Sequence, residues 1–197
     1  MKRLLAINGS YREHGVIDQA VAAMAEALEA AGAQVEQVRL RDVPIEFCRN
    51  CRECTQVPGE APGRCVQSDA MQGLIERIEA ADGYILACPT NFYSVTALFK
   101  RFMERLIVYA YWPWGRTAPK MRRKGGDKPA ILIASCAAPG LMGRLFYTTL
   151  KQLNMTAKTI GARAVGRRFI GLISHEPQPG LKQKEIQRLH NIARRLL

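Results

Sequence analysis

The cysteines of this chain are concentrated in one short segment. Four of the six occur in CRNCRECTQVPGEAPGRC, residues 48–65, at Cys48, Cys51, Cys54 and Cys65. Four thiolates in a C-x2-C-x2-C-x10-C pattern could ligate a [4Fe–4S] cluster or a tetrahedral zinc ion, or they could remain free, redox-sensitive thiols. The zinc interpretation lacks the usual two separated C-x2-C pairs. The residues alone leave these three chemistries open.

A second candidate segment is NGSYREHGV, residues 8–16, which follows a short apolar run. Gly15 precedes the first helical residues, Val16 and Ile17, and N–H groups at a helix start favour an anion. Ser10 can donate a hydrogen bond to a phosphate, and Arg12 can neutralise its charge. The sequence contains neither GxGxxG nor GxxxxGK[ST], so a dinucleotide fingerprint and an ATP-binding P-loop are both absent.

Two further loops combine small, polar and aromatic residues. CPTNFYS, residues 88–94, offers polar groups beside two aromatic faces, which suits a flat heteroaromatic ring. SCAAPG, residues 135–140, is built of small residues that let the backbone approach a ligand closely. The candidate residues are Pro89, Thr90, Asn91, Phe92, Tyr93, Ser135, Ala137, Pro139 and Gly140. Read separately, each loop is equally compatible with an ordinary turn.

The elements around these loops alternate along the chain. Apolar runs predict strands at 3–7, 34–40, 83–89, 128–136 and 161–173. Helical spacing of apolar residues predicts helices at 16–32, 68–82, 94–110, 141–157 and 181–197. Five alternations predict one α/β domain over residues 1–197, with a doubly wound parallel sheet in the order 2-1-3-4-5 and helices on both faces. The loops after strands one, three and four then meet at the carboxyl edge of the sheet.

Charge and composition narrow the possible partners. Residues 1–100 have a net charge of −3 and residues 101–197 a net charge of +15, so the second half can attract anions. No secretory signal or membrane-length apolar run is found, and we expect a cytoplasmic protein. The insert at 109–128, YAYWPWGRTAPKMRRKGGDK, joins aromatic to basic residues and is either a functional flap or an exposed loop. No nucleic-acid-binding motif is present, so we expect no nucleic-acid partner.

Taken together, the three loops resemble those of the flavodoxin-like NAD(P)H-dependent FMN reductases. GSYR, residues 9–12, is similar to the family's phosphate loop, and PTNFYSVTALFKRFMER, residues 89–105, is similar to the loop and helix beside the flavin. The resemblance covers most of the chain. It departs at Val16 and Ile17, where many members carry a side-chain donor. Phosphate binding would then rely on backbone N–H groups, Ser10 and Arg12.

The resemblance implies a function and a set of cofactors. It implies an FMN-dependent oxidoreductase that takes electrons from NAD(P)H and passes them to a quinone, a flavin, a metal ion or a protein. The chemistry would be carried by the flavin, so no catalytic side chain is predicted. It also implies a homodimer or tetramer, with the 109–128 insert as a flap over the flavin, a subunit contact, or a receiver of NADPH phosphates.

The cysteine segment, residues 44–67, resembles the compact motif of the iron–sulfur flavoproteins, a branch of the same family. That resemblance implies a [4Fe–4S] cluster on Cys48, Cys51, Cys54 and Cys65, although the last spacing is longer here than in that branch. The alternatives are free thiols near the flavin or zinc. Two rival functions follow: an iron–sulfur flavoprotein acting as an electron carrier, and a redox sensor using these cysteines.

Overall fold

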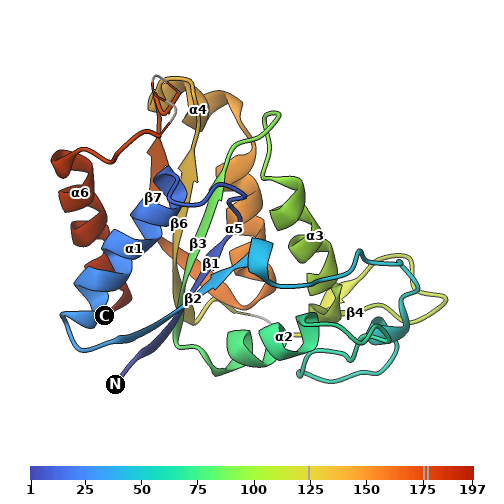
Figure 1. The fold of residues 1–197 in the computed structure, drawn as a ribbon. Coiled ribbons are helices and arrows are strands. Elements are labelled where there is room, and N and C mark those ends of the chain that lie inside the picture. The colour runs from blue at the N-terminus through green and yellow to red at the C-terminus, as the bar shows by residue number, and fades with distance from the viewer. Residues whose placement is uncertain (124, 175, 177) are drawn as a thin grey trace.

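The protein is built on one five-stranded parallel sheet (Figure 1). This computed structural model describes residues 1–123, 125–174, 176 and 178–197. The strands lie in the order β2-β1-β3-β6-β7, and every neighbouring pair is parallel. Their bounds are β1 Arg3–Asn8, β2 Gln34–Arg39, β3 Gly83–Pro89, β6 Lys128–Ser135 and β7 Ala162–Ile170. The predicted flavodoxin-like sheet and its strand order are confirmed.

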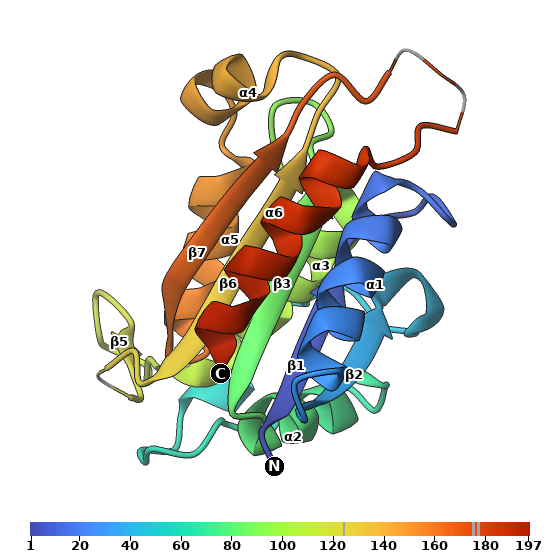
Figure 2. The same ribbon diagram turned by 90° about the vertical axis from the view of Figure 1, so that its left-hand side faces the viewer.

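Helices cover both faces of the sheet. Figure 2 shows two of them side by side over one face: α1 Val16–Glu29 and α6 Gln183–Ala193. The opposite face is covered by α2 Met71–Ala80, α3 Ala97–Arg105 and α5 Thr149–Thr159. Consecutive residues of a strand point to opposite faces, so Ile85 packs beneath α1 while Leu86 packs on the other side. The central strands are therefore continuous apolar runs, as parallel strands buried on both faces must be.

The predicted helix at 141–157 is two helices. A short helix, α4 Gly140–Phe146, ends before Tyr147, whose backbone is extended. The N–H of Thr148 then donates to the carbonyl of Tyr93 at 2.9 Å, and its hydroxyl donates to the same oxygen at 3.0 Å. The helical pattern is interrupted because these bonds tie the chain to a neighbouring turn.

The insert at 109–128 contains a small hairpin. Its strands are β4 Ala110–Tyr111 and β5 Lys120–Met121, and they pair antiparallel. The predicted helix at 94–110 is α-helical only over α3 and continues as a 3-10 turn, Leu106–Tyr109. Lys124, part of the predicted insert, lies outside the described residues.

No helix among the residues that the structure describes has the length and apolar character needed to cross a membrane.

Gly9 sets how closely the end of β1 approaches α3. The carbonyl of Gly9 accepts a 2.7 Å hydrogen bond from Thr96, and a Cβ at Gly9 would lie 2.7 Å from Phe99 Cδ2 and 3.0 Å from Cys88 Sγ. We expect Gly9→Ala to lower the free energy of unfolding by about 1–3 kcal/mol, because a well-packed core must shift to admit the methyl group. Urea denaturation measures this.

Gly73→Ala is the matched control, because a Cβ there meets nothing within 4 Å and the position lies inside α2. It should leave stability unchanged or raise it by up to about 1 kcal/mol. Equal stabilities of the two variants would contradict the close approach at Gly9.

Candidate functional site

The three predicted loops meet at the carboxyl edge of the sheet and enclose a cavity, here called the edge cleft. Its volume is about 680 Å³. Ten of the residues predicted from the sequence line it: Ser10, Arg12, Gly15, Val16, Ile17, Pro89, Thr90, Asn91, Ser135 and Ala137. Sites at this edge are typical of doubly wound folds, since the loops there leave adjacent strands in different directions.

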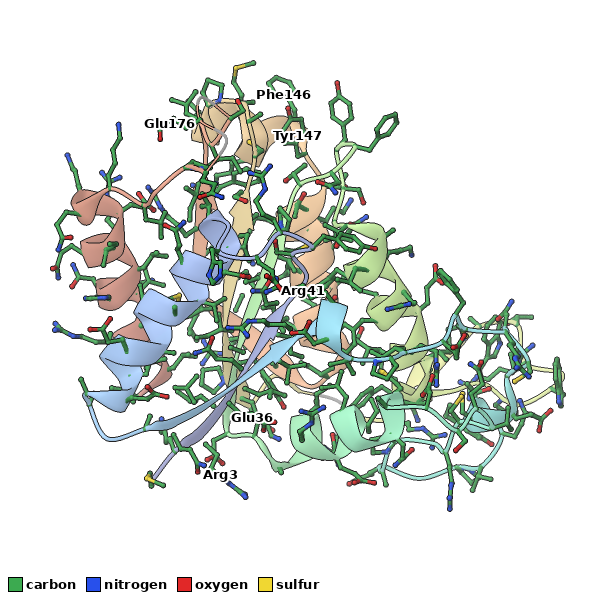
Figure 3. The ribbon with its side chains drawn as sticks, viewed as in Figure 1. Arg3, Glu36, Arg41, Phe146, Tyr147 and Glu176 are labelled. Carbon is green, nitrogen blue, oxygen red and sulfur yellow. The ribbon has the colours of Figure 1, made fainter. Side chains whose placement is uncertain are left out.

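Hydrogen bonds from a neighbouring arginine fix the conformation of the first of these loops, residues 8–16. Arg41 lies in the 3-10 turn Leu40–Asp42 after β2, and its side chain contacts the start of α1 (Figure 3). Its guanidinium donates to Asp18 Oδ2 at 3.0 Å and to the carbonyls of Ser10 and Arg12 at 3.3 and 3.2 Å. Burial raises the pKa of Asp18, but hydrogen bonds from Arg41 and Asn8 outweigh it and leave that pKa below its usual value. Sequence analysis missed Arg41, because its partner is distant in the chain.

The start of α1 faces the edge cleft with its backbone. Gly15 is the N-cap residue and supplies no side-chain hydrogen bond to the first turn. Val16 and Ile17 are 5% and 2% exposed, and they belong to the apolar core beneath α1. Main-chain N–H groups are therefore the donors that this helix start offers to an anion.

The opposite wall of the cleft joins the loops after β3 and β6. The N–H of Thr90 donates to the carbonyl of Ser135 at 2.7 Å, and the Thr90 hydroxyl lies 2.7 Å from that of Thr149. Ser135 is fully buried, and its Oγ has no hydrogen-bond partner in the described part of the chain. A buried hydroxyl lacking a partner is unfavourable, so this atom is suited to bind a polar group of a ligand in the cleft.

Four predicted residues do not line the edge cleft. Phe92 and Tyr93 are 99% and 64% exposed, at the tip of a turn closed by Asn91 and Ser94. Pro139 precedes α4, and Gly140 lines a neighbouring cavity. A contact between these four residues and a bound ring stays a prediction.

Several residues that line the cleft were not predicted. Thr96 is the N-cap of α3: its Oγ1 accepts from Phe99 N–H at 3.1 Å and donates to Gly9. The others are Tyr11, Cys136, Ile173, Ser174, Glu176 and Pro179. Ile173, Ser174, Glu176 and Pro179 follow β7. The position of this loop after the fifth parallel strand, at the same edge of the sheet, could have identified them as lining residues.

The four clustered cysteines line one small cavity at the far end of α3. Arg105, which is 1% exposed, also lines this cavity. Its guanidinium donates to the Asp69 carboxylate, to the carbonyl of Glu46 at 2.8 Å and to Cys65 Sγ at 3.5 Å. A buried positive charge therefore lies beside the sulfur of Cys65.

As the side chains lie, the described residues contain no group of three or more His, Cys, Asp or Glu that could hold a metal ion. The cavity measures about 20 Å³, which is room for about one water molecule. Four cysteine thiolates suit either a [4Fe–4S] cluster or a tetrahedral zinc ion, and the cysteines as they lie form neither site. Burial and the neighbouring cysteines raise the pKa of Cys54 to about 11, which makes that thiol a slow nucleophile.

The cysteine cavity and the edge cleft are at opposite ends of α3. Thr96, at the start of the helix, lines the cleft, and Arg105, at its end, lines the cavity. A nine-residue helix spans about 13 Å. Within one chain the thiols are therefore not in contact with the cleft.

The aromatic–basic insert covers the cysteine loop, and none of its described residues lines the edge cleft. Arg52 has a left-handed backbone, with φ of 63°, and its guanidinium lies 3.8 Å from the ring centre of Trp112 and 4.4 Å from that of Trp114. Arg122 donates to the carbonyls of Cys54 and Val57 at 3.1 and 2.9 Å. Within this chain the insert therefore packs on the cysteine loop, whereas one prediction had placed it as a flap over the flavin.

We expect Arg52→Lys to loosen the cysteine loop, because lysine cannot stack its charge between two indole rings as a planar guanidinium does. Labelling of the thiols by a disulfide reagent should become roughly tenfold faster, within the range expected for lost cation–π and hydrogen-bond contacts. Arg64→Lys is the control, since Arg64 is exposed in the same loop and lies outside the cysteine cavity. Unchanged labelling of the Arg52 variant would show that the two tryptophans do not hold the loop.

The sequence matches known proteins over most of its length. The model of the NADPH-dependent FMN reductase family matches residues 2–169. An iron–sulfur flavoprotein of Archaeoglobus fulgidus is 34% identical over 111 residues, which cover 56% of this chain and 48% of that protein. An iron–sulfur flavoprotein of Methanosarcina thermophila is 24% identical over 106 residues, covering 54% and 53%. The chain thus spans about half the length of the curated relatives it matches.

Solved structures share the fold at low sequence identity. An NAD(P)H:quinone oxidoreductase from Methanothermobacter marburgensis has a TM-score of 0.67 and 15% identity, with 100% of this chain and 99% of that chain covered. An FMN-dependent NADH-azoreductase from Bacillus anthracis, solved with FMN, has a TM-score of 0.65 and 13% identity, with the same coverage. With the match to residues 2–169, the fold and the edge cleft identify this chain as a member of the NADPH-dependent FMN reductase family.

Proposed function

We propose that the protein binds FMN in the edge cleft and acts as an NAD(P)H-dependent oxidoreductase. The observation that carries this proposal is the cleft itself: three loops converge on it, and it contains the buried, unpartnered hydroxyl of Ser135. The family match supports the same cofactor pair. The electron acceptor would be a quinone, a free flavin, a metal ion or a protein.

The residues of the cleft divide into two groups by their chemistry. Ser10, Arg12 and the N–H groups that begin α1 would hold the FMN phosphate, because they combine donors with a positive charge. Thr90, Asn91, Ser135 and Ala137 would hold the ring system, through polar atoms and close backbone approach. Arg41 and Asp18 keep the phosphate loop in shape without lining the cleft.

Bound FMN supplies the hydride and electron chemistry, and the protein binds, orients and shields it. We assign no side chain as nucleophile or general base. The buried wall formed by Thr96 and Ser135 keeps water away from the inner part of the cleft.

FMN titration, followed by quenching of flavin fluorescence, tests the site. We expect Ser135→Ala to weaken FMN binding by about tenfold, because one hydrogen bond in a buried site is lost. Ser68→Ala is the control, since Ser68 is exposed and lies outside the cleft. FMN-loaded wild-type protein should oxidise NADPH or NADH in steady state. Failure of the wild-type protein to take up FMN would overturn the proposal.

A second candidate function is that of an iron–sulfur flavoprotein, with a [4Fe–4S] cluster on Cys48, Cys51, Cys54 and Cys65. The specific observation that favours it is that all four sulfur-bearing residues line one cavity, beside the positive charge of Arg105. The curated relatives described above, which are iron–sulfur flavoproteins, support it. A redox sensor that uses the same cysteines as free thiols is the alternative.

Iron analysis of protein purified without oxygen distinguishes the iron–sulfur flavoprotein from the redox sensor with free thiols. We expect about four irons per chain and a broad absorption near ~400 nm that dithionite bleaches. Cys65→Ser should abolish the iron, whereas Cys136→Ser, in the edge cleft, should retain it. Wild-type protein without iron would contradict the cluster, and the protein would then be an FMN reductase whose cysteine loop carries free thiols.

We also propose a homodimer or tetramer and a cytoplasmic location. Leu141, Leu145 and Phe146 of α4 are each about two-thirds exposed or more, and such apolar surface favours association. Figure 3 shows Phe146 at the α4 end of the molecule. All six cysteines are free, which suits a reducing compartment.

A further inference from the structure

A carboxylate lies at the helix start that would hold the FMN phosphate. Asp18 is the third residue of α1, and its Oδ2 accepts a 3.0 Å hydrogen bond from the N–H of His14, the residue before the N-cap Gly15. The carboxylate is therefore at the end of α1 whose backbone lines the edge cleft. Two anions at one helix start repel each other, and the repulsion is stronger where water is excluded.

The same carboxylate fixes the shape of the loop at residues 8–16. Asn8, which is 3% exposed, donates from Nδ2 to Asp18 Oδ1 at 2.6 Å, and its own Oδ1 accepts from the N–H of Ser10 at 2.8 Å. At the other end of the loop, His14 has a left-handed backbone with φ of 55° and donates to Asp18. Hydrogen bonds from two neutral donors favour the charged form of a carboxylate, so Asp18 brings order and a negative charge together.

Arg41 is placed to cancel that charge. Its guanidinium donates to both oxygens of Asp18, at 3.3 and 3.0 Å. The two side chains are only 12% and 10% exposed, so solvent ions screen the pair little. Asp42, the other carboxylate beside Arg41, is 60% exposed and lies 3.8 Å from Nε, which makes it a weak competitor. Arg41 does not line the edge cleft, so it acts on a ligand there through Asp18.

We propose that Arg41 is a positioning residue whose charge cancels that of Asp18, so that the start of α1 can accept the phosphate of FMN. With the ion pair intact, Asp18 orders the loop without repelling the phosphate. Arg41 thereby makes the site selective for a phosphorylated flavin over riboflavin, which has the same ring and no phosphate. This inference rests on the proposed function and deepens it, because it names the residue that sets which flavin the cleft accepts.

A purely structural role of the pair leads to a different expectation. If only the hydrogen bonds mattered, removing either partner would loosen the loop and change the binding of both flavins alike. If charge matters, the two partners act with opposite sign on the phosphate. Loss of Arg41 leaves an unpaired carboxylate beside it, whereas loss of the charge on Asp18 leaves an unpaired guanidinium.

The ratio of FMN affinity to riboflavin affinity, measured by quenching of flavin fluorescence, separates these two roles. We expect Arg41→Gln to lower the ratio about tenfold or more, within the range measured for coupling between close charges. Asp18→Asn should raise the ratio about threefold, because the repelling charge is gone. The double variant Arg41→Gln/Asp18→Asn should return to within about threefold of the wild-type ratio.

Two further variants serve as controls. Arg41→Lys keeps the charge and loses the planar fork, so it should keep most of the selectivity that Arg41→Gln loses. Arg39→Gln is the matched control, since Arg39 is an exposed arginine at the end of β2 and lies outside the cleft. It should leave the ratio unchanged. Thermal unfolding of each variant shows that it is folded.

The sign of the change in ratio decides the inference. An unchanged ratio in Arg41→Gln overturns it, and so does a ratio that falls in Asp18→Asn, which decides the matter even if Arg41→Gln does not fold. In both cases a wild-type protein that binds FMN leaves the proposed function in place. Wild-type protein that binds neither flavin overturns the proposed function together with this inference.

Discussion

The buried ion pair between Arg105 and Asp69 is the interaction on which the cysteine side of the molecule depends. Arg105 is 1% exposed, so its charge must be fully partnered to be tolerated there. Asp69 also accepts from the N–H of Glu46 at 2.7 Å and from that of Met71 at 3.0 Å. One carboxylate thereby fixes the end of α3, the start of α2 and the beginning of the cysteine loop. Removing either partner would leave a buried charge uncompensated, at a cost of about 3–5 kcal/mol.

The separation of the two sites along α3 constrains any electron path. Thr96 ties the start of the helix to β1 through Gly9, and Arg105 ties its end to the cysteine loop. The buried residues between them, including Phe99 and Phe102, pack into the sheet. The helix α3, about 13 Å long, therefore lies between the cysteine loop and the cleft of the same chain. A cluster on these cysteines would have to exchange electrons across that span or with another molecule.

Much of the fold could be predicted from sequence because its signals are local. Continuous apolar runs identify β3 and β6, and the alternation of strands and helices then determines the sheet order and the edge where the loops meet. Contacts between distant segments gave no such signal. Arg41 binds Asp18 across 23 residues, and Arg52 stacks on Trp112 some 60 residues away. The break at Tyr147 was missed for the same reason, since its cause is a hydrogen bond to Tyr93.

The short helix α4 has a thermodynamic consequence. It has seven residues, and Gly143 is the one that is buried, so little apolar burial stabilises it. A helix of this length does not form by itself in water, and its stability must come from neighbours. Local opening of α4 should therefore need much less free energy than global unfolding, and its amides should exchange early. Gly140, Leu141 and Arg144 of α4 line a cavity against β7, so a ligand bound there would first change the order of this helix.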